Sequence, residues 1–553
     1  MKKSTNRANI MLIPLTIIFV ILFVVPFIVL LYYSFLTYKS GQVIPTTPYT
    51  LGAYAKFFSD SFYPRVVGRT IVISLVTALI CSVLGYPVAY FISKSKGYLK
   101  TILLVIVILP LVAGVMVQTL GLYGILTSYG PVNNFLLTLG IIDEPIEFLG
   151  TETGVIIGLT QGFLPYMILP VMNSIQAIPD NVLEAADNLG ANSVHRFLNV
   201  TFPLSKTGVI SGFVLVFGCC LNSYTTPLLL GRGKVSVIGT AIYQQAMQLY
   251  NWPFAAAIAM ILIALVLVVF TITTLLPKKI HKNQGGRGMK RRKFITKMIY
   301  SIIVILILLF IVSPMVAVVG ASFSTTKYFQ FPPQGFSLKW YQEAMGNKEH
   351  INALMISLKV AVCAMILSNL VCLPACFGLT KGSGKIAKKA QALFTAPLFL
   401  PMIALGVGLM LWLAKLGIRG NFWTLVLAHV IVATPYYIRV VGACLAEFDH
   451  GLVDAANSLG ATPGKAFFYV TLPSVAPGII VGSMFAFMLS FSELIITLFI
   501  SASNMTTFPV RVYSSMVTEG LNPMILAYST IIIIVVLIVS ILAEKFAHWS
   551  KYF

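Results

Sequence analysis

The chain has 553 residues, of which 58% are hydrophobic and only 10% charged, and its mean hydropathy is +0.91. In soluble domains about a quarter of the residues are charged. This composition therefore excludes a water-soluble globular protein and predicts a surface largely covered by lipid. The net charge of +22 is also typical of nucleic-acid-binding proteins. Here, however, the basic residues fall between apolar runs, so we expect a membrane topology and no nucleic-acid partner.

Twelve apolar windows in the sequence approach or exceed the roughly 20 residues that a helix needs to cross a bilayer. We therefore predict an all-α membrane protein with about twelve transmembrane helices. In chain order, the predicted spans cover residues 10–35, 70–93, 101–126, 154–174, 207–230, 254–276, 298–323, 360–380, 390–414, 421–438, 474–500 and 523–543.

Basic residues alternate between the loops in the way that sets membrane orientation. Lys2, Lys3 and Arg7 precede the first predicted span, and Lys94, Lys96 and Lys100 separate the second from the third. Cytoplasmic loops carry the excess of Lys and Arg. A multi-pass protein with both termini in the cytoplasm is therefore expected.

A basic segment divides the chain almost in half. Residues 278–297 read KKIHKNQGGRGMKRRKFITK and show no apolar period. This composition predicts a flexible cytoplasmic linker that lies against anionic lipid headgroups. It separates a first domain, residues 1–277, from a second, residues 298–553, each with six predicted spans.

The two halves share a repeated motif. EAADNLGANSVHRFLNVTFPLSKTGVISG begins at Glu184 and DAANSLGATPGKAFFYVTLPSVAPGIIVG begins at Asp454, and an offset of 270 residues aligns them without a gap. The same offset pairs Pro165-Tyr166 with Pro435-Tyr436. Equal numbers of spans in the halves imply parallel repeats around a central axis. The first half carries an insertion before Pro165, which we assign to the outward-facing loop after its third span.

The repeated motif resembles the EAA motif of ABC-importer permeases. It reads Glu184-Ala185-Ala186 with Gly190 in the first copy, and Asp454-Ala455-Ala456 with Gly460 in the second. Asp454 in place of Glu and Phe202 in place of Leu are modest departures from the family pattern. The resemblance implies two tandem six-helix domains of the type I importer fold, with coupling helices near residues 180–203 and 450–473.

The same resemblance implies the location and the partners of the chain. We expect a bacterial inner-membrane protein that binds a homodimer of a cytoplasmic ABC ATPase and receives solute from an extracytoplasmic binding protein. No GxxxxGK[ST] phosphate loop occurs in the sequence. ATP and Mg would therefore bind to the partner ATPase, and this chain is expected to hold no cofactor, metal or catalytic residue. Its seven cysteines lack paired spacing and are interpreted as buried structural thiols.

Several segments are most similar to permeases of the spermidine/putrescine type. TSYGPVNNFLLTLGIIDEPI and NWPFAAA resemble one polyamine permease subunit, and FPPQGFSLKWY and EGLNP resemble the other. Importers of ferric iron, thiamine and aminoethylphosphonate share this superfamily and remain alternatives. An ion-coupled secondary transporter is an alternative of another class, but it would be expected to place several acids within its spans.

Glu493 is the only acid well inside a predicted span, and buried charges often mark a solute pathway. At the offset of 270 its counterpart is Ser223, within Asn222-Ser223-Tyr224. These four residues are our candidates for the substrate pathway. The alternative for Glu493 is that its side chain snorkels to the membrane interface or bonds to a neighbouring helix. His429, also within a span, is expected to form a hydrogen bond between helices.

Overall fold

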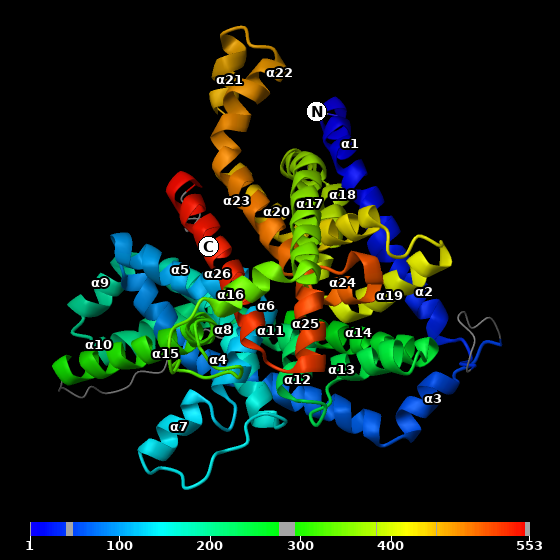
Figure 1. The fold of residues 1–553 in the computed structure, drawn as a ribbon. Helices are drawn as coiled ribbons and strands as arrows, with labels where there is room; N and C mark the ends of the chain where they lie inside the picture. Colours follow the sequence, from blue (N-terminus) through cyan, green and yellow to red (C-terminus); the bar gives the residue numbers. More distant parts are fainter. Residues whose placement is uncertain (1, 40–47, 276–292, 383, 450, 548–553) are drawn as a thin grey trace.

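The computed structural model of the chain describes residues 2–39, 48–275, 293–382, 384–449 and 451–547 (Figure 1). Helices make up most of these ranges, and no β-strand forms within them. The predicted all-α class is therefore confirmed. Most of the predicted linker, residues 278–292, lies outside the described residues.

The first half consists of long helices and of the short helices that connect them. The long ones are α1 (Lys2–Phe19), continued through η1 (Val20–Val24) into α2 (Val25–Ser34), α4 (Phe62–Lys94), α5 (Gly97–Ala113), α6 (Val115–Ile125), α8 (Glu152–Gln176), α11 (Phe202–Leu221) and α14 (Trp252–Leu275). The short ones are α3 (Gly52–Ser59), α7 (Pro131–Thr138), α9 (Asp180–Asn188), α10 (Ser193–Arg196), η2 (Phe197–Thr201), α12 (Thr225–Leu230), α13 (Ile238–Tyr243) and η3 (Gln244–Gln248).

The second half repeats this order of helices. The long ones are α15 (Lys293–Ser322), α17 (Lys348–Lys381), α18 (Lys385–Thr395), α19 (Met402–Lys415), α20 (Phe422–Glu447), α23 (Leu472–Phe491), α25 (Phe508–Glu519) and α26 (Pro523–Ala547). The short ones are α16 (Lys339–Gly346), η4 (Ala396–Leu398), α21 (Gly451–Ser458), α22 (Pro463–Ala466), η5 (Phe467–Thr471), α24 (Ile495–Ile500) and η6 (Ser503–Met505).

The described residues do not confirm the predicted number of twelve spans. Within the described ranges, nine helices are long and apolar enough to cross a membrane, and two bent pairs raise the number to at most eleven. The apolar stretch Pro523–Val539 of α26 is shorter than these spans. The spans predicted at residues 101–126 and 390–414 correspond to the two bent pairs. The bends were not predicted, because hydropathy measures the apolar length of a segment and not its direction.

The two bends have local causes. Between α5 and α6 the backbone turns at Gly114, whose φ of +86° favours glycine, and the Gln118 side-chain amide donates to the Pro110 carbonyl across the turn. Between α18 and α19 the chain turns by 100° just before helix α19, with Pro401 at its N-cap. Both bends therefore come from residues that end or redirect a helix.

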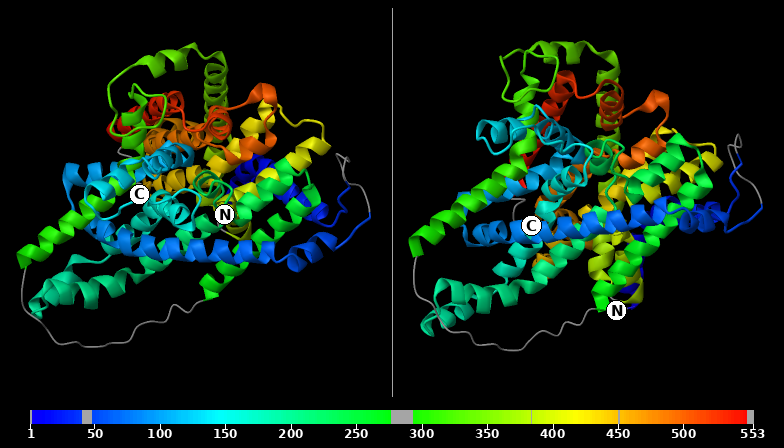
Figure 2. Two further views of the ribbon diagram at one scale, coloured as in Figure 1. Left: turned by 60° about the horizontal axis from the view of Figure 1, so that its bottom comes forward. Right: turned by 90° about the horizontal axis from the view of Figure 1, so that it is seen from below.

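The first helix of each half packs on the other half. α1 lies along α17 and α2 along α19, while α15 lies against α4 and α6. Figure 2 shows α15, in green, beside the blue and cyan helices of the first half. The two hydrophobic cores are mixed accordingly, since one contains residues of α4, α8 and α15 and the other contains residues of α1, α17 and α20.

Two glycines at equivalent positions allow the first helix of each half to pack on the other half. A Cβ atom on Gly408 of α19 would lie 2.7 Å from the carbonyl oxygen of Pro26 in α2, and a Cβ on Gly121 of α6 would overlap the carbonyl oxygen of Pro314 in α15. Small residues let backbones approach closely in membrane proteins. The two Gly–Pro contacts occupy equivalent places in the halves, so the repeats are related by a pseudo-two-fold axis.

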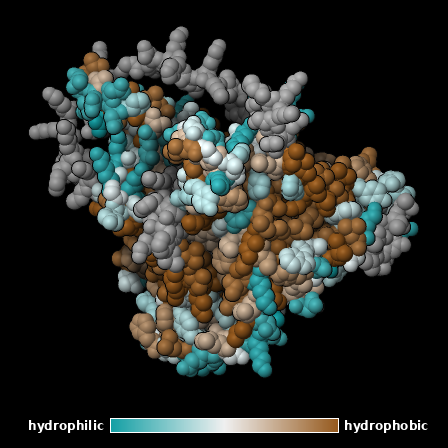
Figure 3. Space-filling model, turned by 90° about the horizontal axis from the view of Figure 1, so that it is seen from above, coloured by the Kyte–Doolittle hydropathy of each residue, from teal (hydrophilic) through white to brown (hydrophobic). Residues whose placement is uncertain are grey.

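The outer surface fits a lipid environment. The face shown in Figure 3 carries a broad area of hydrophobic side chains with hydrophilic ones toward its margins. Long apolar side chains such as Ile17, Val83, Leu309 and Leu370 are more than half exposed. A soluble protein rarely exposes so much contiguous apolar surface.

Candidate functional site

The two EAA segments end in the same backbone turn. Helices α9 and α21 each end at a glycine with positive φ, +80° at Gly190 and +85° at Gly460. The glycine N–H donates to the backbone carbonyl of Asp187 in the first copy and to that of Asn457 in the second, each at 3.0 Å. The next N–H, of Ala191 or Ala461, donates to the carbonyl of Ala186 or Ala456 at 3.0 Å. This is the Schellman arrangement, in which glycine is preferred because it has no Cβ atom.

The candidate coupling residues lie on the surface in both copies. Glu184 and Ala185 are exposed and Ala186 is half-buried, and the equivalent residues Asp454, Ala455 and Ala456 show the same pattern. Figure 1 shows α21 and α22 projecting from the same end of the molecule at which α1 begins. Both segments are therefore accessible to a partner.

A matched pair of leucines stands beside these glycines, and the sequence analysis did not single it out. Leu189 and Leu459 directly precede Gly190 and Gly460, and each is 89% exposed. The offset of 270 that aligns the motifs also pairs these leucines, so the signal was available. Each EAA segment therefore presents one large, exposed apolar side chain beside its terminal glycine.

The two segments differ in how they are braced. In the first copy Arg196 forms an ion pair with Asp187 at 2.6 Å, which ties α10 to α9. The second copy has Ala466 and Asn457 at these positions, so its brace is missing. The first EAA segment is therefore held by a side-chain contact that the second cannot form.

The predicted pathway residues lie where a membrane helix is interrupted. α11 ends at Leu221 and α12 begins at Thr225, and α23 ends at Phe491 and α24 begins at Ile495. Glu493 therefore lies in a break and not inside the continuous span predicted for residues 474–500. Ser492 and Glu493 can bond to nearby backbone groups in place of the helical ladder. Interrupted helices at membrane depth are tolerated where they are buried in protein or line a cavity.

Glu493 has a structural contact at this break. Its Oε1 atom accepts a hydrogen bond from the Ile496 N–H at 2.8 Å and so caps the start of α24, while the residue remains partly exposed. Asn222 and Ser223 are likewise partly exposed at the equivalent break. Tyr224 differs from them because it is fully buried, with its ring 5.1 Å from that of Tyr243.

His429 contacts both of the helices that flank the break in the second half. Its Nδ1 atom lies 2.7 Å from Ser490 Oγ on α23, and its Nε2 atom lies 2.9 Å from Thr497 Oγ1 on α24. The hydrogen bond predicted between helices is therefore confirmed, and it joins α20 to both sides of Glu493. Leu159 occupies the equivalent place in the first half, so this polar brace is specific to the second.

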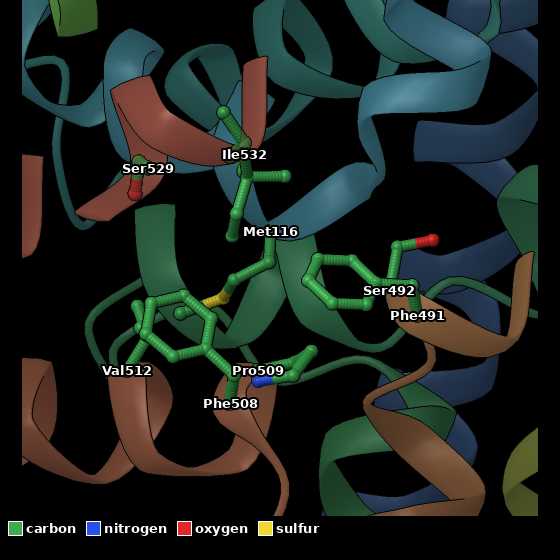
Figure 4. A pocket seen from close by; sticks show the side chains of 9 residues that line it. Met116, Phe491, Ser492, Phe508, Pro509, Val512, Ser529 and Ile532 are labelled. Atoms are coloured by element: carbon green, nitrogen blue, oxygen red, sulfur yellow. The ribbon is translucent and has the colours of Figure 1, made fainter. Parts of the chain in front are cut away.

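The two halves meet beside Ser492. A Cβ atom on Gly114 would lie 2.6 Å from Ser492 Cβ, so the bend of the first half is pressed against the break of the second. A cavity of about 20 Å³ opens there (Figure 4), large enough for roughly one water molecule. Its walls come from α6, α23, α25 and α26 and are formed by Met116, Val117, Phe491, Ser492, Phe508, Pro509, Val512, Ser529 and Ile532.

Within the described residues, no group of three or more His, Cys, Asp or Glu side chains could hold a metal ion. The seven cysteines form no disulfide bonds, and Cys81, Cys220, Cys372, Cys376 and Cys444 are buried. The polar groups that the structure gathers at the breaks suit the binding or passage of a solute.

Comparison with known proteins assigns residues 82–282 and 374–551 to one family, described as "Binding-protein-dependent transport system inner membrane component". The two matches fall in the two halves and together cover well over half of the chain. They include both EAA segments and both interrupted helices.

Individual relatives match about half of the chain each. The spermidine/putrescine transport system permease protein PotB of Haemophilus influenzae is 34% identical over 274 residues, which are 95% of that protein and 49% of this chain. The putrescine transport system permease protein PotI of Escherichia coli is 37% identical over 255 residues, 88% of that protein and 44% of this chain. The crystal structure of a bacterial alginate ABC transporter in complex with an alginate-bound periplasmic protein aligns with a TM-score of 0.41 at 21% identity, covering 48% of this chain and 91% of that chain.

Proposed function

The chain belongs to the family of binding-protein-dependent transport system inner membrane components, and from that premise we propose that it moves polyamines such as spermidine or putrescine into the bacterial cell. It is a transport subunit with two permease domains in one polypeptide. The observation that carries the choice of cargo is the identity of 34% and 37% to two permeases named for polyamines, each matched over most of its length.

The proposed energy source is a cytoplasmic ABC ATPase that binds the two EAA segments. Exposed Leu189 and Leu459 supply apolar contacts, and the small side chains of Ala185 and Ala455 allow a close approach of the partner. Two equivalent segments suit two copies of the same ATPase, because each copy would meet the same backbone shape. In this arrangement ATP and Mg bind the partner, and both termini lie on the cytoplasmic side.

The proposed source of solute is a separate extracytoplasmic binding protein. Polyamines carry several ammonium groups, and the partly exposed residue Glu493 places a carboxylate at the break between α23 and α24. A carboxylate in a medium of low dielectric attracts a cation more strongly than it does in water. The same carboxylate would repel an anionic solute and hinder its passage.

Uptake into proteoliposomes tests this function. The chain would be reconstituted with its ATPase and its binding protein and supplied with labelled spermidine, putrescine and aminoethylphosphonate. ATP-dependent uptake of spermidine or putrescine is the expected result. Uptake of aminoethylphosphonate alone would leave the permease assignment intact and overturn the polyamine assignment.

A further inference from the structure

A basic surface lies at the turn between α17 and α18. It consists of four exposed lysines, Lys381, Lys385, Lys388 and Lys389. Lys385 lies three and four residues before the other two lysines of α18, so these three share one side of the helix. The opposite side of α18 is buried, and the Phe394 ring on it lies 5.3 Å from the ring of Phe19 in α1. The lysines are therefore carried by a helix that is fixed to the rest of the protein.

The first half has an equivalent surface at the turn between α4 and α5. It is formed by Lys94 and Lys96, which are exposed, and Lys100, which is half-buried. Lys94 and Lys381 are 287 residues apart, the same offset as between the two glycines that contact the first helices. The two basic surfaces are therefore repeats of one feature.

Large apolar side chains are exposed beside the lysines of both surfaces. Tyr98 and Ile102 of α5 are 90% and 54% exposed, and Ile386 of α18 is 59% exposed. Tyrosine is enriched at the boundary between lipid headgroups and acyl chains, and lysine side chains extend from that depth toward the phosphates. Each surface therefore combines side chains that suit both parts of a phospholipid.

The lysines of both surfaces lie in stretches of sequence without acidic residues. No Asp or Glu occurs in residues 61–142 or 350–446. Among the residues that the structure describes, none of the ion pairs involves these lysines. Lys385 and Lys388 also lie in the first turn of α18, where positive charge opposes the helix dipole. Neither salt bridges nor helix stability therefore explain the positions of the lysines.

Both surfaces adjoin the packing of one half on the other. α18 contacts α1, the first helix of the first half, and α5 contacts α15, the first helix of the second half. Figure 1 shows α18 beside α1. A ligand held at either turn therefore lies next to a contact between the two halves.

We propose that each basic surface binds the headgroup of an anionic phospholipid, and that these lipids strengthen the packing of α1 and α15 on the opposite halves. The family is a component of the inner membrane, so lipid phosphates surround the ends of α4 and α17. Anionic lipids give the membrane surface a negative potential that attracts clustered lysines, whereas a zwitterionic lipid has no net charge. Basic residues at such turns also orient a chain during insertion, but orientation requires charge alone and not lysines fixed beside a helix of the other half. The inference concerns the membrane and does not depend on the solute.

Retention of lipid by the purified chain tests the proposal. The chain in detergent would be given equal amounts of phosphatidylglycerol and phosphatidylethanolamine, and native mass spectrometry would count the molecules of each that remain bound. Preferential retention of phosphatidylglycerol is the expected result for the wild type. Each lysine contributes about fivefold to the affinity, so Lys385→Gln, Lys388→Gln and Lys389→Gln in one chain should weaken phosphatidylglycerol binding at α18 about a hundredfold.

A matched variant controls for the loss of net charge. Lys327, Lys339 and Lys348 are also exposed, but they lie around α16, at the opposite end of α17. Replacing these three lysines by glutamine removes the same amount of charge. This control variant should retain phosphatidylglycerol as the wild type does.

The melting transition in detergent tests the effect of the lipid on packing. A ligand that binds the folded chain stabilises it, so phosphatidylglycerol should raise the Tm of the wild type and of the control variant. It should raise the Tm of the α18 variant less. Salt at about 1 M should remove the difference, because it screens charges on an exposed surface.

Three results would overturn the proposal. Equal retention of the two lipids by the wild type would exclude a specific headgroup site. Equal weakening by the α18 and the control substitutions would reduce the effect to net charge. Retention of phosphatidylglycerol without a rise in Tm would exclude its role in packing. The experiment contains no ATPase, binding protein or solute, so these results are independent of the proposed function.

Discussion

The exchange of first helices can be tested by adding a single carbon atom at Gly408. The new Cβ of Gly408→Ala would lie 2.7 Å from the Pro26 carbonyl oxygen, 3.0 Å from its carbonyl carbon and 3.2 Å from its Cβ. Close carbon–oxygen contacts in proteins are about 3.3–3.6 Å, so α2 and α19 would have to separate by roughly half an ångström. Overpacking of this kind costs about 1–3 kcal/mol.

Co-expressed halves make this cost measurable. With the gene cut in the linker, recovery of the untagged half on a tagged partner reports association, and the cost above predicts a weakening of roughly five- to a hundredfold. Gly121→Ala should weaken association at least as strongly, because its Cβ would overlap the Pro314 carbonyl oxygen at the equivalent contact. Gly68→Ala is the control, since its Cβ would meet nothing within 4 Å. Equal recovery of the Gly408→Ala, Gly121→Ala and Gly68→Ala halves would refute the exchange of first helices.

Three further predictions follow from the same geometry. Replacing Gly190 or Gly460 by valine should uncouple ATP hydrolysis from transport without preventing membrane insertion, because positive φ is strained for a β-branched residue; normal transport by both variants would exclude these turns as coupling elements. Halves separated in the linker should assemble when co-expressed and transport solute, since each completes the core of the other; absence of activity with both halves assembled in the membrane would contradict this. Glu493→Gln should lower spermidine uptake several-fold, because the amide oxygen can still accept from the Ile496 N–H but the charge is lost; unchanged uptake would remove Glu493 from the pathway.

The sequence is most informative about features that depend on short stretches of chain. Apolar length identified the membrane helices, and the gapless repeat located two EAA segments that fold alike down to their terminal glycines. The hydrogen bonds of His429 were also predictable, because a polar group inside a span must find a partner. Each of these inferences needs only local composition or spacing.

Features that depend on tertiary contact were missed. Hydropathy cannot tell a straight span from a bent or interrupted one, so the turn at Gly114 and the break at Glu493 were predicted as continuous helix. The packing of α1 and α15 on the opposite halves requires knowledge of neighbours that no apolar window contains.

The central claim is that this single chain provides a complete membrane pathway for a polyamine. The most direct test is ATP-dependent uptake of labelled spermidine by proteoliposomes that contain the wild-type chain, its ATPase and its binding protein. Uptake that requires all three proteins and is competed by putrescine is the predicted result. Absence of spermidine and putrescine uptake, in vesicles whose ATPase is stimulated by the loaded binding protein, would contradict it.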